Sequence, residues 1–257
     1  MLKGRNILYI KTCIVINGVP MERLSTGIQG LDKKVGDGYP GKKGILITGA
    51  PGSGKTILAM HAINQACTDG KKSVIMATEE TEEDITEQAK MFGFPFEEYI
   101  KNGLLEVVKI LEMRSRSVTK AAEMIDGLSF KQVDLINMPE LIPYDAEVIV
   151  MDNIGVFAIG LTPREFRDQF DTLNLLLSQK DVTTLFVMDE AAHQMTHEVA
   201  DYSTFGNIKL LVKENPYTGK MERFIFIPKM RNTAISLDPV PFDITSKGID
   251  IKGKKDN

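Results

Sequence analysis

The stretch GAPGSGKT, at residues 49–56, has residue types and a spacing that indicate phosphate chemistry. It matches the pattern G-x-x-x-x-G-K-[ST], in which glycines let the backbone curl until its N–H groups point at phosphate oxygens. In this pattern Lys55 is expected to reach the β- and γ-phosphates, and Thr56 to hold Mg²⁺. The phosphate-binding loop itself would consist of Gly49, Ala50, Pro51, Gly52, Ser53 and Gly54. The motif predicts ATP and Mg²⁺ as cofactors.

Acidic residues that follow two other apolar runs are candidates for the rest of the chemistry. Asp152 ends the run VIVMD, and an acid at the end of a buried strand is typical of the second magnesium-side residue in P-loop proteins. Glu79 and Glu80 end another run, and one of their carboxylates could orient and deprotonate an attacking water. The alternative is a solvated, acidic helix start, which is our interpretation of Glu82 and Glu83. For Glu79 and Glu80 we favour function, because α/β sheets bind ligands at the carboxyl ends of their strands.

Alternating apolar runs and amphipathic stretches predict the elements that must position these residues. Strands are expected at 44–49, 73–78, 104–110, 147–152 and 183–190, and helices at 55–70, 81–94 and 163–181. Residues 112–145 are mixed and do not indicate one element. The motif at 49–56 thus lies between a strand and a helix, which argues against a chance match in a glycine-rich turn. Strands separated by helices predict an α/β fold with a mostly parallel, twisted central sheet flanked by helices.

The C-terminal part is predicted to form an antiparallel edge of this sheet. Strands at 207–213 and 222–228 would make a hairpin around ENPYTGK, and 241–251 would form one more short pair. The stretch FIFIPKMRNT, at residues 224–233, begins as a buried strand, and Lys229 and Arg231 follow two positions apart. In an extended chain such positions point to the same side, so two cations should project together from the strand end.

The composition is that of a globular protein with one large domain. The chain has 257 residues, with 43% hydrophobic and 26% charged residues. A formal net charge of −4 argues weakly against a constitutive nucleic-acid binder. Two cysteines, Cys13 and Cys67, form no CxxC pair, so neither a disulfide framework nor a zinc site is expected, and a cytoplasmic location fits best. Apolar runs are too short for a transmembrane helix, and we expect no membrane partner.

Three segments are expected along the chain. Residues 1–20 form an N-terminal extension, which is either a small edge strand or a segment upstream of a natural start at Met21. Residues 21–251 form the ATPase domain, and residues 252–257 a polar tail.

Several of these segments resemble the KaiC-type ATPases of the RecA/RadA superfamily. LSTGIQGLDKKVGDGYPGKKGILITGAPGSGKT is similar to the opening of that family, and ATEETEEDITEQAKMFGF to the segment that carries its paired catalytic glutamates. KMRNTAISLDPVPFDITSKGIDI resembles the K-M-R-G-T closing motif. The resemblance spans roughly residues 21–251 and implies a single-domain, RecA-like P-loop core. One departure is Asn232, which stands where the family usually has Gly and matters if that loop needs a positive φ.

The resemblance also implies how the protein works. The family forms hexameric rings with ATP between subunits, and the Lys and Arg of the K-M-R motif reach the γ-phosphate held by the neighbouring subunit. Carried over, these residues are Lys229 and Arg231, and a cation supplied by a neighbour can stabilise charge on the transferred phosphoryl group. We therefore expect a homo-hexamer with slow ATP hydrolysis that acts as a regulatory switch, with an unidentified protein partner.

Two other functions stay open at this point. One is a RecA/RadA paralogue that binds single-stranded DNA through basic residues in 113–120 and at Arg164 and Arg167. A solvated helix face is the simpler interpretation of both segments. The other is a nucleotide-gated scaffold without useful turnover.

Overall fold

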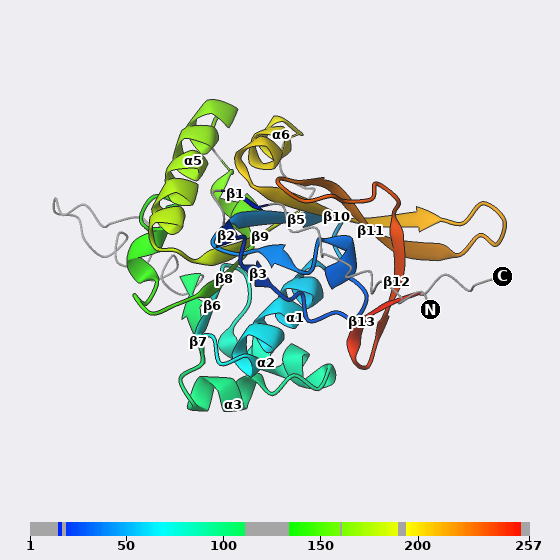
Figure 1. The fold of residues 1–257 in the computed structure, drawn as a ribbon, viewed down its shortest axis with the longest axis horizontal. Coiled ribbons are helices and arrows are strands. Elements are labelled where there is room, and N and C mark those ends of the chain that lie inside the picture. Colours follow the sequence, from blue (N-terminus) through cyan, green and yellow to red (C-terminus); the bar gives the residue numbers. More distant parts are fainter. Residues whose placement is uncertain (1–14, 17–18, 111–133, 160, 190–193, 253–257) are drawn as a thin grey trace, which may run out of the picture.

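The computed structural model describes residues 15–16, 19–110, 134–159, 161–189 and 194–252. Its main feature is a nine-stranded sheet with the order β13-β12-β11-β10-β5-β9-β8-β6-β7 (Figure 1). These strands are β5 (Gly44–Gly49), β6 (Ser73–Ala77), β7 (Leu105–Lys109), β8 (Val148–Asp152), β9 (Thr183–Asp189), β10 (Gly206–Glu214), β11 (Met221–Met230), β12 (Val240–Thr245) and β13 (Gly248–Ile251).

Strand direction divides the sheet into two parts. From β10 to β7 all neighbouring strands are parallel, whereas β11, β12 and β13 follow β10 in antiparallel order. The predicted α/β class, the mostly parallel sheet and the antiparallel C-terminal edge are confirmed. The glycine-rich loop follows β5, which lies between β10 and β9 in the parallel part.

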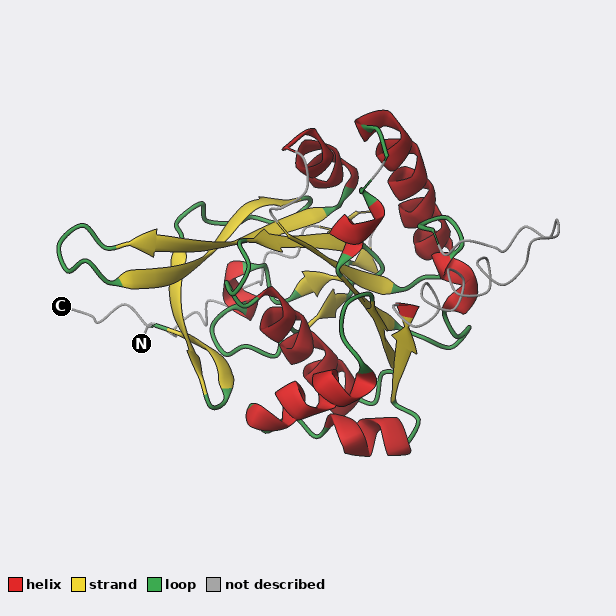
Figure 2. Cartoon of the chain, turned by 180° about the vertical axis from the view of Figure 1, so that it is seen from behind, coloured by secondary structure: helices red, strands yellow, loops and turns green. Residues whose placement is uncertain are grey.

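Helices cover both faces of the sheet (Figures 1 and 2). One side carries α1 (Lys55–Thr68), α2 (Glu82–Met91) and α3 (Phe96–Lys101), and the other carries α5 (Pro163–Gln179) and α6 (Gln194–Ser203). Local sequence explains two helix starts, since Thr81 and Thr162 each form a capping box with the acid three residues later.

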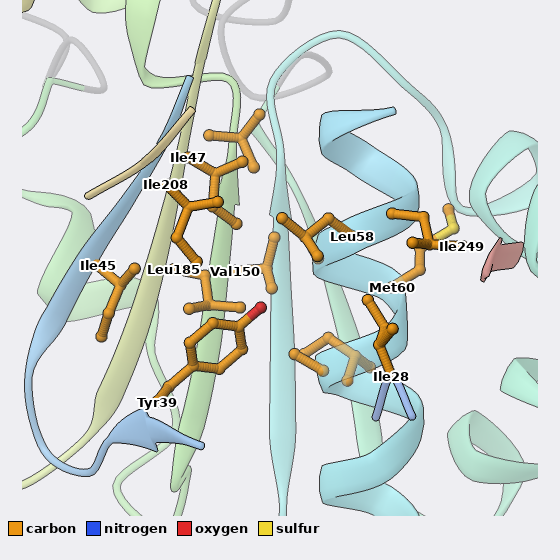
Figure 3. Packing of buried hydrophobic residues seen from close by; sticks show 14 of the residues in the cluster. Ile28, Tyr39, Ile45, Ile47, Leu58, Met60, Val150, Leu185, Ile208 and Ile249 are labelled. Carbon is orange, nitrogen blue, oxygen red and sulfur yellow. The ribbon is translucent and has the colours of Figure 1, made fainter. Parts of the chain in front are cut away.

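Alternation along the strands sends side chains to two separate cores. In β5, Ile45 and Ile47 join the cluster on the α1 side, whereas Leu46 joins the cluster under α5. Figure 3 shows Leu58 of α1 packed near Val150, Leu185 and Ile208, which come from three different strands. Because both faces are buried, these strands are almost continuously apolar, which is why their apolar runs predict them well.

Strand β11 differs from the prediction because it continues through Pro228 to Met230. Its register against β10 shifts where Phe226 pairs with Lys209 and Lys229 pairs with Asn207. This shift places an extra residue in β11 beside Pro228, and a bulge is a position where a strand tolerates proline. Lys229 therefore lies within β11, and Arg231 follows directly after Met230, the last residue of that strand.

Smaller elements complete the description. The pairs β1 (Val15–Ile16) with β2 (Val19–Pro20) and β3 (Arg23–Leu24) with β4 (Tyr39–Pro40) form separate two-stranded sheets. Short 3₁₀ helices cover Asp32–Lys34, Met138–Leu141 and Ile154–Phe157. The sequence patterns did not predict α3 and α6, and the mixed segment 112–145 lies outside the described residues as far as 133. Within the described ranges, no helix combines the length and the apolar character that crossing a bilayer requires.

Candidate nucleotide-binding site

The glycine-rich loop connects the end of β5 to the start of α1. Gly54 precedes the helix with a φ of 105°, in the region that favours glycine. A Cβ atom on Gly49 would lie 2.6 Å from the carbonyl oxygen of Leu210 in β10, so only glycine fits there. The loop therefore runs close to the neighbouring strand and turns into the first turn of a helix. Backbone N–H groups at such a turn can bind an anion.

Lys55 is almost entirely buried at the first position of α1, with 7% of its side chain exposed. Its ammonium donates hydrogen bonds to the carbonyl oxygens of Gly49 (3.0 Å) and Ala50 (3.2 Å). It also forms an ion pair with the carboxylate of Asp189, the last residue of β9. The lysine is thus held inside the curl of the loop.

Thr56 and Asp152 come together from different elements. The Thr56 hydroxyl donates a hydrogen bond of 2.7 Å to Asp152 Oδ2 at the end of β8. Burial raises the pKa of Asp152 to about 6. The hydrogen bond from Thr56 lowers this pKa, and the negative charge of Glu80 raises it. A hydroxyl and a carboxylate are oxygen ligands of the kind Mg²⁺ prefers, and Mg²⁺ uses few protein ligands when phosphates supply others. The pair fits the predicted magnesium site.

A polar network joins the ends of β6, β8 and β9 beside this pair. The backbone N–H of Asn153 donates to Thr78 Oγ1 (2.7 Å), and the Asn153 side chain donates to Asp189 Oδ2 (2.8 Å). The sequence patterns predicted a strand at 183–190 but did not assign Asp189, at its end, to the site. Its assignment needs the strand order, because β9 lies between β5 and β8.

Glu79 and Glu80 both line a cavity of about 260 Å³ beside the loop. Lys55, Thr56, Asp152 and Asp189 line the same cavity, so the structure brings together the residues predicted from three different strands. Glu80 is half-buried and accepts a hydrogen bond of 2.7 Å from the side chain of Gln88, whereas Glu79 is exposed.

Lys229 and Arg231 do not join this cavity. Both reach the carbonyl oxygen of Tyr202 at the end of α6, at 3.5 Å from Lys229 Nζ and 3.1 Å from Arg231 Nη2. The lysine also donates to the carbonyl oxygen of Asp201. The prediction that the two cations project to the same side is confirmed. Asn232 has a φ of 55°, so this loop does adopt the conformation for which asparagine is better suited than most residues.

The strand register places these cations near the amino ends of the parallel strands, opposite to the ends that carry the cavity. Gly206 of β10 pairs with Ile45 at the start of β5 and with Met230 at the end of β11. The Arg231 N–H donates to the carbonyl oxygen of Phe205, and the Phe205 N–H donates to that of Gly44. The glycine-rich loop leaves β5 at the opposite end, after Gly49, which is about 16 Å away for a strand of this length.

Together, the mostly parallel sheet and the glycine-rich loop between β5 and α1 define a RecA-type P-loop core. Comparison with protein families agrees with this fold and identifies the particular family. The model of the family described as "ATPase: KaiC" matches residues 24–256, so the chain belongs to the KaiC ATPase family.

Individual relatives agree with this family. The UPF0273 protein MK0039 of Methanopyrus kandleri is 28% identical over 242 residues, covering 91% of this chain and 94% of that protein. The circadian clock oscillator protein KaiC of Synechococcus elongatus is 28% identical over 232 residues, and the match covers 90% of this chain but 42% of KaiC. The crystal structure of the KaiC-like protein PH0186 from Pyrococcus horikoshii has a TM-score of 0.71 at 26% identity, covering 91% of this chain and all of that one.

Proposed function

We propose that this protein binds ATP with Mg²⁺ in the cavity beside the glycine-rich loop and hydrolyses it slowly to ADP and phosphate. The observation that carries the proposal is the hydrogen bond of 2.7 Å between Thr56 and Asp152. It brings the hydroxyl of the GKT motif and the acid of a separate strand to one point at the mouth of the loop. Family membership supports the same activity.

In this proposal, the groups that line the cavity have different roles. Backbone N–H groups of the loop hold the phosphates, Lys55 binds the β- and γ-phosphates, and Thr56 and Asp152 hold the metal. Mg²⁺, when bound, neutralises charge on the phosphate oxygens. Glu79 or Glu80 orients a water and accepts its proton while the water oxygen bonds to the γ-phosphorus and the bond to the ADP oxygen breaks.

Lys229 and Arg231 are proposed to act on the nucleotide of a neighbouring copy. They lie at the end of the strands opposite to the glycine-rich loop of their own chain, so they have no direct role in that chain's cavity. In a ring in which this surface packs against the cavity of the neighbouring subunit, the two cations stabilise negative charge on the γ-phosphoryl group bound there. The arrangement supports a homo-oligomer, which we propose to be a hexamer, in agreement with the family resemblance.

Mixing inactive variants tests the shared site. Arg231→Ala should retain ATP binding and lose most phosphate release, and the double variant Glu79→Gln/Glu80→Gln should behave likewise. A mixture of the two should regain activity, because some interfaces then combine an intact arginine with intact glutamates. Arg164→Ala, on an exposed part of α5, is the matched control and should release phosphate at the wild-type rate. A mixture that regains nothing would show that Arg231 does not act across an interface.

The ATPase cycle is proposed to serve as a regulatory switch in the cytoplasm, acting on a protein partner. The DNA-binding alternative gains nothing from the described basic residues. Arg164 and Arg167 each face the carboxylate one helical turn later, at 4.0 Å and 3.5 Å, and the segment 113–120 lies outside the described residues. Salt-sensitive binding of single-stranded DNA would favour that alternative, and ring assembly without phosphate release would favour the scaffold.

A further inference from the structure

The ammonium of Lys55 has no proton left for a phosphate. A lysine ammonium carries three donors. Here one points to the carbonyl oxygen of Gly49, one to that of Ala50, and the third pairs with the carboxylate of Asp189. The two carbonyls belong to the loop that surrounds the lysine, whereas Asp189 comes from β9 and lines the cavity. Asp189 is thus the partner that occupies the side of Lys55 facing the cavity.

Asp189 is itself held in place. The side chain of Asn153 donates a hydrogen bond of 2.8 Å to its other carboxylate oxygen. Asn153 is in turn anchored by its backbone to Thr78, and these two residues are almost fully buried. The carboxylate therefore has a defined position before any ligand arrives, and it is not a mobile surface acid that pairs with whichever cation is near.

We propose that Asp189 is a positioning residue that holds Lys55 in the empty site, so that an incoming nucleotide phosphate must displace this carboxylate before Lys55 can bind it. This inference rests on the proposed function, because it takes the phosphate as the competing anion. The competition lowers nucleotide affinity, since part of the attraction between lysine and phosphate is offset by loss of the ion pair. It also keeps the buried ammonium neutralised while the cavity holds no ligand.

The variant Asp189→Asn tests the competition by removing the charge and keeping the shape. We expect it to bind ATP roughly tenfold more tightly than the wild type, measured by calorimetry. Removing any carboxylate near a phosphate could tighten binding by relieving repulsion, so a second measurement on the empty protein is needed. Acylation of Lys55 by an N-hydroxysuccinimide ester, followed by peptide mass spectrometry, should be roughly threefold faster or more in the variant.

The pair Lys72 and Asp145 provides the matched control, since its two charged atoms lie 2.9 Å apart away from the cavity. Asp145→Asn should change the acylation of Lys72 but neither the acylation of Lys55 nor the affinity for ATP. If Asp189→Asn does not fold by circular dichroism, Asp189→Ser replaces it, because serine also removes the charge and keeps a small polar side chain.

The outcomes separate the possibilities. Tighter binding with faster acylation of Lys55 supports the proposal. Tighter binding with unchanged acylation shows that Asp189 acts by repulsion alone, and unchanged or weaker binding shows no competition; either result overturns it. If the wild type binds no ATP, the proposed function fails, and the acylation rates still decide whether Asp189 holds Lys55.

Discussion

At the scale of single residues, Asp152 has a carboxyl group in surroundings that oppose its charge. Burial is the main cause of a pKa of about 6, above the ordinary value of 3.8. The folded protein therefore binds a proton more readily than the unfolded chain between these values, and this residue's contribution to stability falls as the pH rises through that range. At neutral pH the residue is mostly ionised and destabilises the protein without its ligand, which a bound cation would reverse.

Replacing Asp152 by Asn should separate stability from binding. The amide oxygen can still accept the hydrogen bond from Thr56, so without ligand the unfolding free energy at pH 7 should rise by about 3 kcal/mol. Magnesium-dependent nucleotide binding should be lost, because the amide carries no charge. Urea unfolding and calorimetry with ATP and Mg²⁺ measure the two effects. A variant that is less stable and still binds the metal–nucleotide complex would remove Asp152 from the site.

His61 is a second residue whose surroundings predict a pH effect. The Ile249 N–H donates to Nε2 at 2.8 Å, so the ring proton lies on Nδ1 and faces the Gly27 carbonyl oxygen at 3.2 Å. Burial lowers the pKa of His61 to about 4. The unfolded chain takes up the proton first, so the stabilisation from the neutral ring is present above about pH 6.5 and is lost as the pH falls towards 4.

The expected result is a pH-dependent difference between the wild type and His61→Gln. Between pH 7 and pH 4 the wild type should lose about 3 kcal/mol more unfolding free energy than the variant, which cannot gain this proton. Urea titrations at several pH values measure the difference, and comparing the two proteins cancels the opposite trend of Asp152. Parallel curves would show that folding does not lower the pKa of His61.

At the scale of elements, the loop between β5 and α1 depends on two glycines for different reasons. A Cβ on Gly49 would meet the Leu210 carbonyl oxygen at 2.6 Å, whereas a Cβ on Gly52 would meet nothing within 4 Å, and only its φ of 73° opposes a side chain. Gly49 is restricted by the neighbouring strand as well as by its φ of 155°, whereas Gly52 is restricted by its backbone alone.

Alanine at the two positions should therefore have unequal effects. Gly52→Ala should cost about 1 kcal/mol of unfolding free energy, the usual penalty for a left-handed conformation. Gly49→Ala must push β10 away from β5 and should cost well over about 3 kcal/mol. Urea unfolding of both variants tests this order. Equal losses would mean that the approach of β10 does not restrict Gly49.

At the scale of the whole molecule, the two sets of candidate residues lie at opposite ends of the strands of one sheet. The cavity residues follow the carboxyl ends of β5, β6, β8 and β9, and Lys229 and Arg231 lie at the amino edge. An interface that joins unlike surfaces repeats around a ring when its rotation closes. The opposite positions of the two sets therefore fit the proposed assembly of identical subunits, which is a ring if that rotation closes.

The mass in solution tests this assembly. With ATP and Mg²⁺ the protein should have about six times the 28.6 kDa of one chain, and Lys55→Ala should assemble less because it binds no nucleotide. Light scattering during size-exclusion chromatography measures the mass, with Lys72→Ala as the control lysine variant. A wild-type protein that stays monomeric while it releases phosphate would show that the cavity works without a neighbour.

The sequence by itself determined the contiguous features of this protein. The order strand, glycine-rich loop and helix is local, so residues 49–56 predicted both the loop and its elements, and the fully buried strands appear as apolar runs. Tertiary structure decided what depends on strand order. Asp189 meets Lys55 only because β9 pairs with β5, and Arg231 lies away from the loop only because β11 runs antiparallel to β10. Such contacts join distant positions whose local patterns are ordinary, so only the folded sheet shows them.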